Sequence, residues 1–388
     1  MQRKSSFDVA VVGTGLAGLA AALGCAQQGL SVALVGPRPT PSSPSAFDAR
    51  IYAIAPASVD LLARLGVWSQ VDPARTCAVE RMRVFGDSGE ELTFDAYGAT
   101  VERLATIVEE RELQRVLEAA CDYQPAIARR AVAFASFSEA DDGLRIELAD
   151  GSALVARLLI GADGANSAVR AAAGISATVK PYGQTAVVAN FACERPHLNT
   201  AWQWFTEEGV VALLPLPGNH VSLVWSAPAS LAEKLAALPV AELAQRVTTR
   251  SGSALGAMNA VGAAHSFALR LITVQRLISN RLALVGDAAH VVHPLAGQGL
   301  NLGLQDIAQL LDVIRARETF RDLGDSVLLR RYERPRAEAI GLMRFTTDGL
   351  ARLFVIDDPF VRRLRNTGMA VVNRLVPLKN ALIRQALG

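Results

Sequence analysis

The chain has 388 residues, of which 51% are hydrophobic and 20% are charged, and its formal net charge is +2. This composition excludes an intrinsically disordered protein and a basic nucleic-acid-binding arm, and the length permits more than one domain. The four cysteines form no Cys-X-X-Cys pair, which argues against a metal cluster or a disulfide framework and favours a reducing compartment. No apolar run reaches the roughly 18 residues of a membrane span, so we expect a cytoplasmic protein.

The first motif is a glycine-rich turn inside a predicted strand–helix–strand unit. The strand, helix and second strand are predicted over Phe7–Val12, Ala17–Gln28 and Ser31–Val35. Between the first strand and the helix, Gly13, Gly15 and Gly18 form a Gly-X-Gly-X-X-Gly pattern. Such glycines let backbone N–H groups approach a pyrophosphate, whose charge the helix N-terminus favours. The second strand leads into Gly36, where dinucleotide sites usually place an acid on the adenosine ribose.

The middle of the chain predicts sheet structure that interrupts this nucleotide-binding unit. A hairpin is predicted over Glu80–Phe94 and an antiparallel meander over Val132–Ile160. A separate sheet is predicted over Ala186–Leu271, with one helical insert over Leu231–Val247. A short helix with Ser58 as its N-cap is predicted over Ser58–Leu65. Because nucleotide-type and sheet-type segments alternate along the chain, we expect a discontinuous domain interrupted by a second one.

A second glycine motif, GDAAHVVHPLAGQGLNLGLQD, spans Gly286–Asp306. It lies between a predicted core strand, Arg281–Gly286, and a predicted helix, Gly299–Arg315. A carboxylate at Asp287 can hold a sugar hydroxyl, and the free N–H groups of the helix can support the anionic edge of a planar ring. The two glycine turns can therefore serve one long ligand, which favours FAD over NAD.

Three fingerprints, GTGLAG, GADGANSAVR and GDAAHVVHPLAGQGLNLGLQD, resemble those of the single-component FAD-dependent aromatic hydroxylases, which have the para-hydroxybenzoate hydroxylase fold. More narrowly, FDARIYAIAPASVDLLARLGVW, VALLPLPGNHVSLVW and the C-terminal LRNTGMAVVNRLVPLKNALIRQALG resemble the ubiquinone-biosynthesis hydroxylases. The resemblance implies a mixed α/β (α+β) fold: a discontinuous Rossmann-like FAD-binding domain, an interleaved antiparallel-sheet substrate domain and C-terminal helices. The expected segments are 1–78, 99–180 and 273–345 for FAD binding, 79–98 and 181–272 for the substrate domain, and 346–388 for the helical region.

The resemblance also implies roles for particular residues. FAD would be bound by Gly13, Gly15, Gly18, Arg50, Arg111, Asp163, Gly286, Asp287, Gly297, Gly299, Leu300 and Asn301. Pro294 would border the site of oxygen chemistry, with His293 as a candidate for proton transfer. His290 and His293 stand in the motif without supporting acids, so we expect no metal site.

The implied reaction uses reduced flavin and O2 to form a C4a-hydroperoxide that hydroxylates the ring of a prenylated phenol in ubiquinone biosynthesis, with NAD(P)H or another electron donor as reductant. Aromatic and apolar residues of the substrate sheet are candidates for the pocket wall, with core packing as the alternative: Trp202, Trp204, Leu213, Pro215 and Trp225. Trp204 stands where this subfamily is expected to carry an arginine. That departure keeps open a soluble phenolic substrate, and together with Gly36 a non-catalytic accessory subunit.

The partners expected are a prenylated phenol or quinone precursor and no nucleic acid. The basic surplus lies in the last thirty residues or so, where Arg362, Arg363, Arg365, Arg374, Lys379 and Arg384 occur without an acid. This stretch suits either an anionic surface at the inner membrane or a helix docked on its own domain. Membership of a ubiquinone-biosynthesis complex and a homo-oligomer are further alternatives that the sequence leaves open.

Overall fold

The computed structural model describes residues 6–38, 47–86, 90–293, 298–355 and 379–380. Its first sheet has the order β17-β18-β11-β1-β2-β8, and β18, β11, β1, β2 and β8 run parallel. The bounds are β17 Ile278–Ser279, β18 Leu282–Leu284, β11 Ala153–Gly161, β1 Ser6–Val12, β2 Val32–Val35 and β8 Ile127–Arg130. Strands β2 and β18 are apolar and fully buried, β1 and β11 are buried over most of their length, and β8 at the edge is half-buried. The predicted strand–helix–strand unit is confirmed, with α1 at Leu16–Gln27.

The other helices of this region are α2 Pro56–Arg64, α3 Glu110–Tyr123, α4 Ala168–Ala172, α7 Gln298–Arg315 and α8 Ser326–Val355. Helix α1 is buried on nearly every side because it packs against both α3 and α7. Helix α2 begins two residues before the predicted cap, so the prediction that Ser58 caps it is wrong. Pro56 occupies the first helical position, which its fixed φ suits, and Ser58 is buried within the first turn.

The predicted meander is confirmed by β9 Phe134–Ala140, β10 Gly143–Leu148 and β11, which pair antiparallel in sequence order. The predicted hairpin is confirmed by β5 Arg81–Phe85 and β6 Glu91–Asp95. This hairpin does not pair with the meander but forms the edge of the second sheet.

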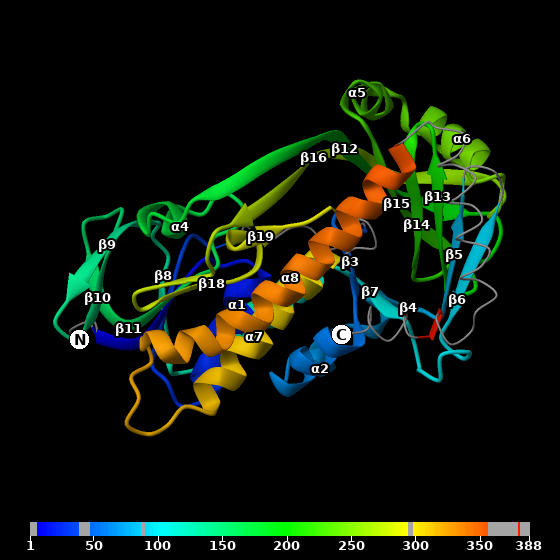
Figure 1. Cartoon of the computed structure of the whole chain (residues 1–388). Helices are drawn as coiled ribbons and strands as arrows, with labels where there is room; N and C mark the ends of the chain where they lie inside the picture. The colour runs from blue at the N-terminus through cyan, green and yellow to red at the C-terminus, as the bar shows by residue number, and fades with distance from the viewer. Residues whose placement is uncertain (1–5, 39–46, 87–89, 294–297, 356–378, 381–388) are drawn as a thin grey trace.

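The second sheet has the order β19-β16-β12-β15-β14-β13-β5-β6 and is antiparallel except for the β13–β5 pair. Its remaining strands are β12 Ala177–Cys193, β13 Thr200–Thr206, β14 Gly209–Leu216, β15 His220–Pro228, β16 Met258–Val274 and β19 His290–Val291. Two helices, α5 Ala229–Ala237 and α6 Val240–Arg250, cover one face (Figure 1). The prediction of one helical insert is therefore wrong, because two helices form there. Pro239 disfavours helical geometry at the preceding Leu238 and so separates the two helices.

A small third sheet, β3-β7-β4, lies between the other two. Its strands are β3 Ile51–Ile54, β7 Ala105–Glu109 and β4 Thr76–Val79. One face, including Ile107, packs toward the second sheet, and the other, including Val108, joins the core around α1. The third sheet therefore packs against both larger sheets and connects them.

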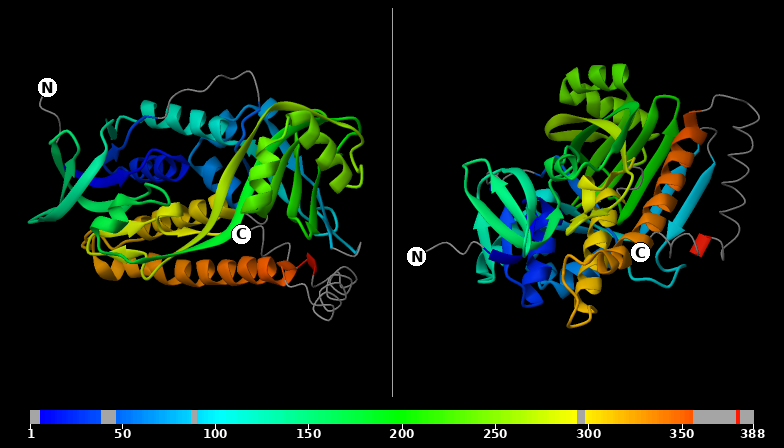
Figure 2. Two further views of the ribbon diagram at one scale, coloured as in Figure 1. Left: turned by 90° about the horizontal axis from the view of Figure 1, so that it is seen from above. Right: turned by 60° about the vertical axis from the view of Figure 1, so that its left-hand side comes forward.

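Two long strands and one long helix connect the ends of the molecule. Strands β12 and β16 have 17 residues each and run from the region of α4 into the second sheet (Figure 1). The expected boundaries after residues 180 and 272 fall inside these strands, and the domain limits stay a prediction. Helix α8 has 30 residues and extends along one side of the molecule (Figure 2). Among the residues described, no helix has both the length and the apolar character to cross a membrane.

Candidate functional site

The first glycine turn joins the end of β1 to the start of α1. Gly13 has a φ of 120°, and a Cβ there would lie 2.2 Å from the carbonyl oxygen of Ala162. A Cβ at Gly18 would lie 2.0 Å from the carbonyl oxygen of Gly13, so both glycines are required by close backbone packing. Gly15 is different: it caps α1 with an ordinary φ of −76°, and a Cβ there would meet no atom of the described residues within 4 Å. The protein itself does not require this glycine, which fits a group approaching the helix N-terminus from outside.

The second glycine turn lies beside the first. Strands β1, β11 and β18 are adjacent and parallel, so the loops after them emerge at one edge of the sheet. Gly286, with a φ of 59°, follows β18, and a Cβ there would lie 3.3 Å from the Cβ of Ala17 in the first turn of α1. The structure therefore brings the two motifs together although they are far apart in sequence.

Asp287 extends from this turn with its side chain exposed. Surrounding protein displaces water and raises the pKa of the Asp287 carboxyl group, while electrostatic interactions with His290, Arg50 and Arg270 act in the opposite direction. An exposed carboxylate that the surrounding protein partly shields from water is suited to accept hydrogen bonds from the hydroxyl groups of a ligand.

Asp163 and Arg170 hold the loop after β11. Asp163 accepts hydrogen bonds from the Ser167 hydroxyl and, at 3.1 Å, from the Val169 N–H, so its carboxylate caps α4. The Arg170 guanidinium donates to the carbonyl oxygens of Ala165 and Ala288, both at 2.9 Å. The GADGANSAVR motif thereby fixes the turn that carries Asp287.

The start of α7 forms another side of the site. A Cβ at Gly299 would meet no atom of the described residues within 4 Å, whereas both polar atoms of the Asn301 side chain bind backbone. Its Oδ1 accepts from the Ala55 N–H at 2.9 Å, and its Nδ2 donates to the Ala53 carbonyl at 2.8 Å. Asn301 thus ties α7 to the β3–α2 turn, and Leu300 beside it is half-buried. Pro294 and Gly297 lie outside the described residues.

The expectation that His290 and His293 have no supporting acid is wrong for His290. Its Nε2 lies 2.6 Å from Oδ2 of Asp306, and both side chains are buried. Helix α7 brings Asp306 back under the turn, which sequence distance alone does not reveal. His293 is also buried; its Nε2 lies 3.0 Å from Oε1 of Gln184, and its ring meets Tyr182 edge-on at 4.7 Å.

The two predicted arginines lie in an ion network. The Arg50 guanidinium is 4.8 Å from the centre of the Phe267 ring and 3.4 Å from Oε2 of Glu110. Arg111 donates to Oε2 of buried Glu109 at 2.8 Å. Arg75 donates to the same oxygen at 2.7 Å. Glu109 and Arg75 were not predicted from the sequence, although an acid ending an apolar strand is a signal for a paired buried charge.

The predicted substrate residues share one face of the second sheet. Trp202 on β13 pairs with Leu213 on β14, and Trp204 pairs with Val211, which in turn pairs with Trp225 on β15. Pro215 lies two residues after Leu213 on β14, so it lies on the same face. Trp202, Leu213 and Trp225 belong to the core beneath α5 and α6. A substrate-lining role for these residues stays a prediction that this placement does not support.

Trp204 itself packs on the same side, with its ring stacked on Phe85 at 5.4 Å between centres. The departure from the expected arginine therefore lies on the helix-covered face. The opposite face carries Asn190 and Gln203, both buried, and Asn190 Nδ2 donates to the Asp48 carbonyl at 3.0 Å near Arg50. This polar face was not predicted, although the alternation in Trp-Gln-Trp at 202–204 is a signal for it.

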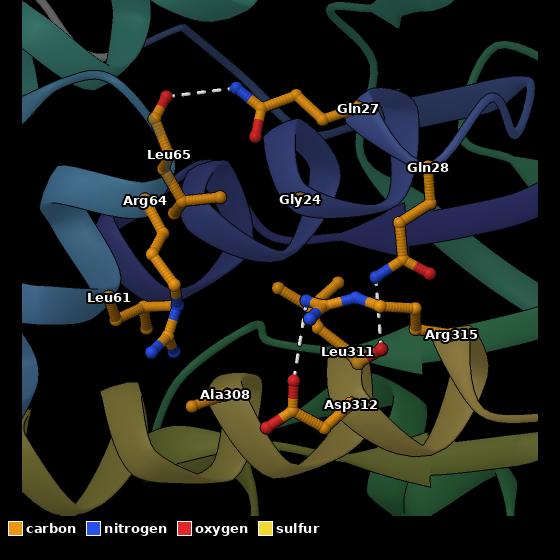
Figure 3. A pocket seen from close by; sticks show the side chains of 10 residues that line it. All are labelled: Gly24, Gln27, Gln28, Leu61, Arg64, Leu65, Ala308, Leu311, Asp312 and Arg315. Carbon is orange, nitrogen blue, oxygen red and sulfur yellow. Dashed lines mark hydrogen bonds and ion pairs between the residues drawn. The ribbon is translucent and has the colours of Figure 1, made fainter.

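A recess of about 170 Å³ lies elsewhere, between α1, α2 and α7 (Figure 3). Gln27 and Gln28 line it, and their amide nitrogens donate to the carbonyl oxygens of Leu65 and Leu311, each at 2.9 Å. It lies at the ends of α1 and α7 that are remote from Gly15 and Gly299. This recess is therefore separate from the edge where the glycine turns meet.

A family model described as an FAD binding domain matches residues 6–344. The chain is 37% identical over 384 residues to ubiquinone hydroxylase UbiL of Rhodospirillum rubrum, covering 98% of this chain and 89% of that protein. It is 35% identical to the 3-demethoxyubiquinol 3-hydroxylase of Escherichia coli, covering 98% of both.

Solved structures share the fold at lower identity. The p-nitrophenol 4-monooxygenase PnpA of Pseudomonas putida has a TM-score of 0.79 at 18% identity, with 99% of both chains covered. HpxO of Klebsiella pneumoniae, complexed with FAD and uric acid, has a TM-score of 0.74 at 21% identity, with 97% of both covered. The predicted fold class and family are confirmed: the chain belongs to the FAD-binding monooxygenase family that contains the ubiquinone-biosynthesis hydroxylases.

Proposed function

We propose that this protein is an FAD-dependent monooxygenase that hydroxylates the ring of a prenylated phenol or quinol on the way to ubiquinone. The observation that carries the proposal is the meeting of both glycine turns and Asp287 at one sheet edge, in a chain similar over almost its whole length to two ubiquinone-pathway hydroxylases.

The described residues fit FAD. Gly15 and Gly299 each leave space that none of the described residues fills, and each lies at the start of a helix. The first turn of α1 would bind the pyrophosphate through backbone N–H groups. Asp287 would accept hydrogen bonds from ribityl hydroxyls, and the α7 N-terminus would face the pyrimidine edge of the ring.

Bound FAD supplies the redox and oxygen chemistry of the reaction, with O2 as oxygen source and NAD(P)H or another donor as reductant. The chain's own part is to position the substrate ring and exclude water. We place the substrate against the sheet face that carries Gln203 and Asn190, because this face is turned away from α5 and α6. His293 and Pro294 would border the reacting ring, where His293 could hold a proton at one ring nitrogen while Gln184 fixes the other.

A prenylated substrate resides in a membrane, so we also propose peripheral contact with the inner membrane. The basic stretch that would make this contact lies almost wholly outside the described residues.

Quinone profiling by mass spectrometry in a strain lacking the gene tests the proposal. We expect one under-hydroxylated prenylated intermediate to accumulate, and the wild-type gene to remove it. Asp287→Asn should fail to complement, whereas Asp312→Asn, an exposed acid at the remote end of α7, should complement fully. An unchanged profile in the deletion strain would refute the pathway role and leave a soluble phenol as substrate. Full complementation by Asp287→Asn would instead support an accessory subunit that needs no flavin.

A further inference from the structure

A buried polar cluster lies directly beneath the turn that carries Asp287. We call it the Asp306 cluster; it consists of Gly286, His290, Asp306 and Arg336. Oδ2 of Asp306 accepts from the Gly286 N–H at 2.9 Å and lies 2.6 Å from Nε2 of His290. Oδ1 of Asp306 accepts from Nε of Arg336 at 2.7 Å. One carboxylate therefore joins the glycine turn, α7 and α8.

The carboxylate of Asp306 is charged in spite of its complete burial. Burial on its own would raise the pKa of the group, but His290, Arg336 and the Gly286 N–H outweigh it and lower the pKa. A buried charge of this kind keeps its partners in place, because loss of one of them leaves the charge without compensation.

Helix α8 contacts the same region through a second side chain, Tyr332, one turn before Arg336. The buried Tyr332 hydroxyl donates to the Leu284 carbonyl of β18 at 2.7 Å. Arg336 also donates from Nη2 to the Leu302 carbonyl of α7 at 3.0 Å. The two side chains are four residues apart and lie on one face of α8, so the helix holds both the strand before the turn and the helix after it.

Close packing restricts the position of the Gly286–Asp287 turn. A Cβ at Gly303 would lie 3.1 Å from the Cα of Gly286, so the turn packs directly on α7. Because Gly286 precedes Asp287, a displaced Asp306 or α8 would move the carboxylate that would bind the ribityl hydroxyls of FAD. Displacements of about 1 Å at such a group are costly for binding and chemistry.

We infer that the Asp306 cluster is a positioning device that couples the docking of helix α8 to the binding of FAD. Asp306 and Arg336 are both buried and would act on the cofactor through the Gly286–Asp287 turn. By reciprocity, FAD that selects the ordered turn stabilises the docked helix by the same free energy. This inference rests on FAD binding and not on the proposed quinol substrate, so an inactive substrate assay does not affect it.

Reconstitution of apoprotein with FAD, followed by flavin fluorescence quenching, tests the first half of this coupling. We expect Arg336→Met to raise the Kd for FAD about ten- to hundredfold, by analogy with the loss of metal affinity when the partners of metal-ligating residues are removed. Arg336→Lys, which keeps the charge, should recover part of the loss. Ile307→Val removes one buried methyl group beside Asp306 without touching the cluster, and its Kd should equal that of the wild type even where its Tm is lower.

Hydrogen–deuterium exchange on the wild-type protein tests the second half. FAD should slow amide exchange around Tyr332–Ile340 in α8, and this protection should disappear in Arg336→Met. Tyr332→Phe, which removes one hydroxyl, provides a milder variant with an expected few-fold rise in Kd if Arg336→Met does not fold. A wild-type Kd in the folded Arg336→Met variant, or equal exchange of α8 with and without FAD, would overturn the inference.

Discussion

Replacing Gly13 and Gly15 separately by alanine should distinguish a glycine needed by the fold from one needed by the ligand. At Gly13 the new Cβ would lie 2.2 Å from a backbone oxygen, and φ is 120°. The left-handed conformation costs roughly 1–2 kcal/mol and the forced backbone shift about 1–3 kcal/mol. We therefore expect Gly13→Ala to lower the free energy of unfolding of the apoprotein by about 2–5 kcal/mol.

At Gly15 the Cβ meets no atom of the described part of the chain within 4 Å, so Gly15→Ala should cost the apoprotein less than about 1 kcal/mol, the penalty for alanine at an N-cap. The same methyl group would stand where the pyrophosphate approaches, and we expect the Kd for FAD to rise more than tenfold, or about 1.4 kcal/mol. Urea unfolding of both apoproteins and titration with FAD measure the two quantities. Wild-type FAD affinity in Gly15→Ala would refute the placement of the pyrophosphate at this turn.

Three further predictions concern charge and the two faces of the sheet. The pKa of Asp287 is raised in the folded protein, so its charge destabilises the apoprotein as pH rises above the ordinary value of 3.8. Asp287→Asn should therefore raise the apoprotein Tm at pH 7 while weakening FAD binding. An unchanged or lower Tm would contradict this. The pKa of Asp306 is lowered, so its stabilisation is present above pH 3.8 and is lost as pH falls further; acid unfolding curves of Asp306→Asn should be flatter below about pH 4. On β13, Trp204→Arg should cost about 0.5–1.5 kcal/mol of stability, because the ring stack on Phe85 is lost, but it should leave substrate preference unchanged. Gln203→Leu, on the opposite face, should raise KM. Steady-state kinetics in which Trp204→Arg changes substrate preference and Gln203→Leu leaves KM unchanged would place the substrate on the other face.

Local patterns in the sequence were sufficient for much of the fold. The strand–helix–strand unit, the meander and the β5–β6 hairpin follow from apolar periodicity and from turn residues that act within a few positions of the chain. The flavin motifs were visible for the same reason: a glycine between a strand and a helix carries its conformational requirement in its own backbone.

Long-range packing decided what the sequence could not show. Alternation places Trp204 and Gln203 on opposite faces of β13, but only the docking of α5 and α6 determines which face becomes core. His290 acquires its acid because α7 returns Asp306 beneath the turn, and Arg336 arrives from α8, thirty residues further on. Burial of charge is a property of several elements packed together, and no single segment of the chain specifies it.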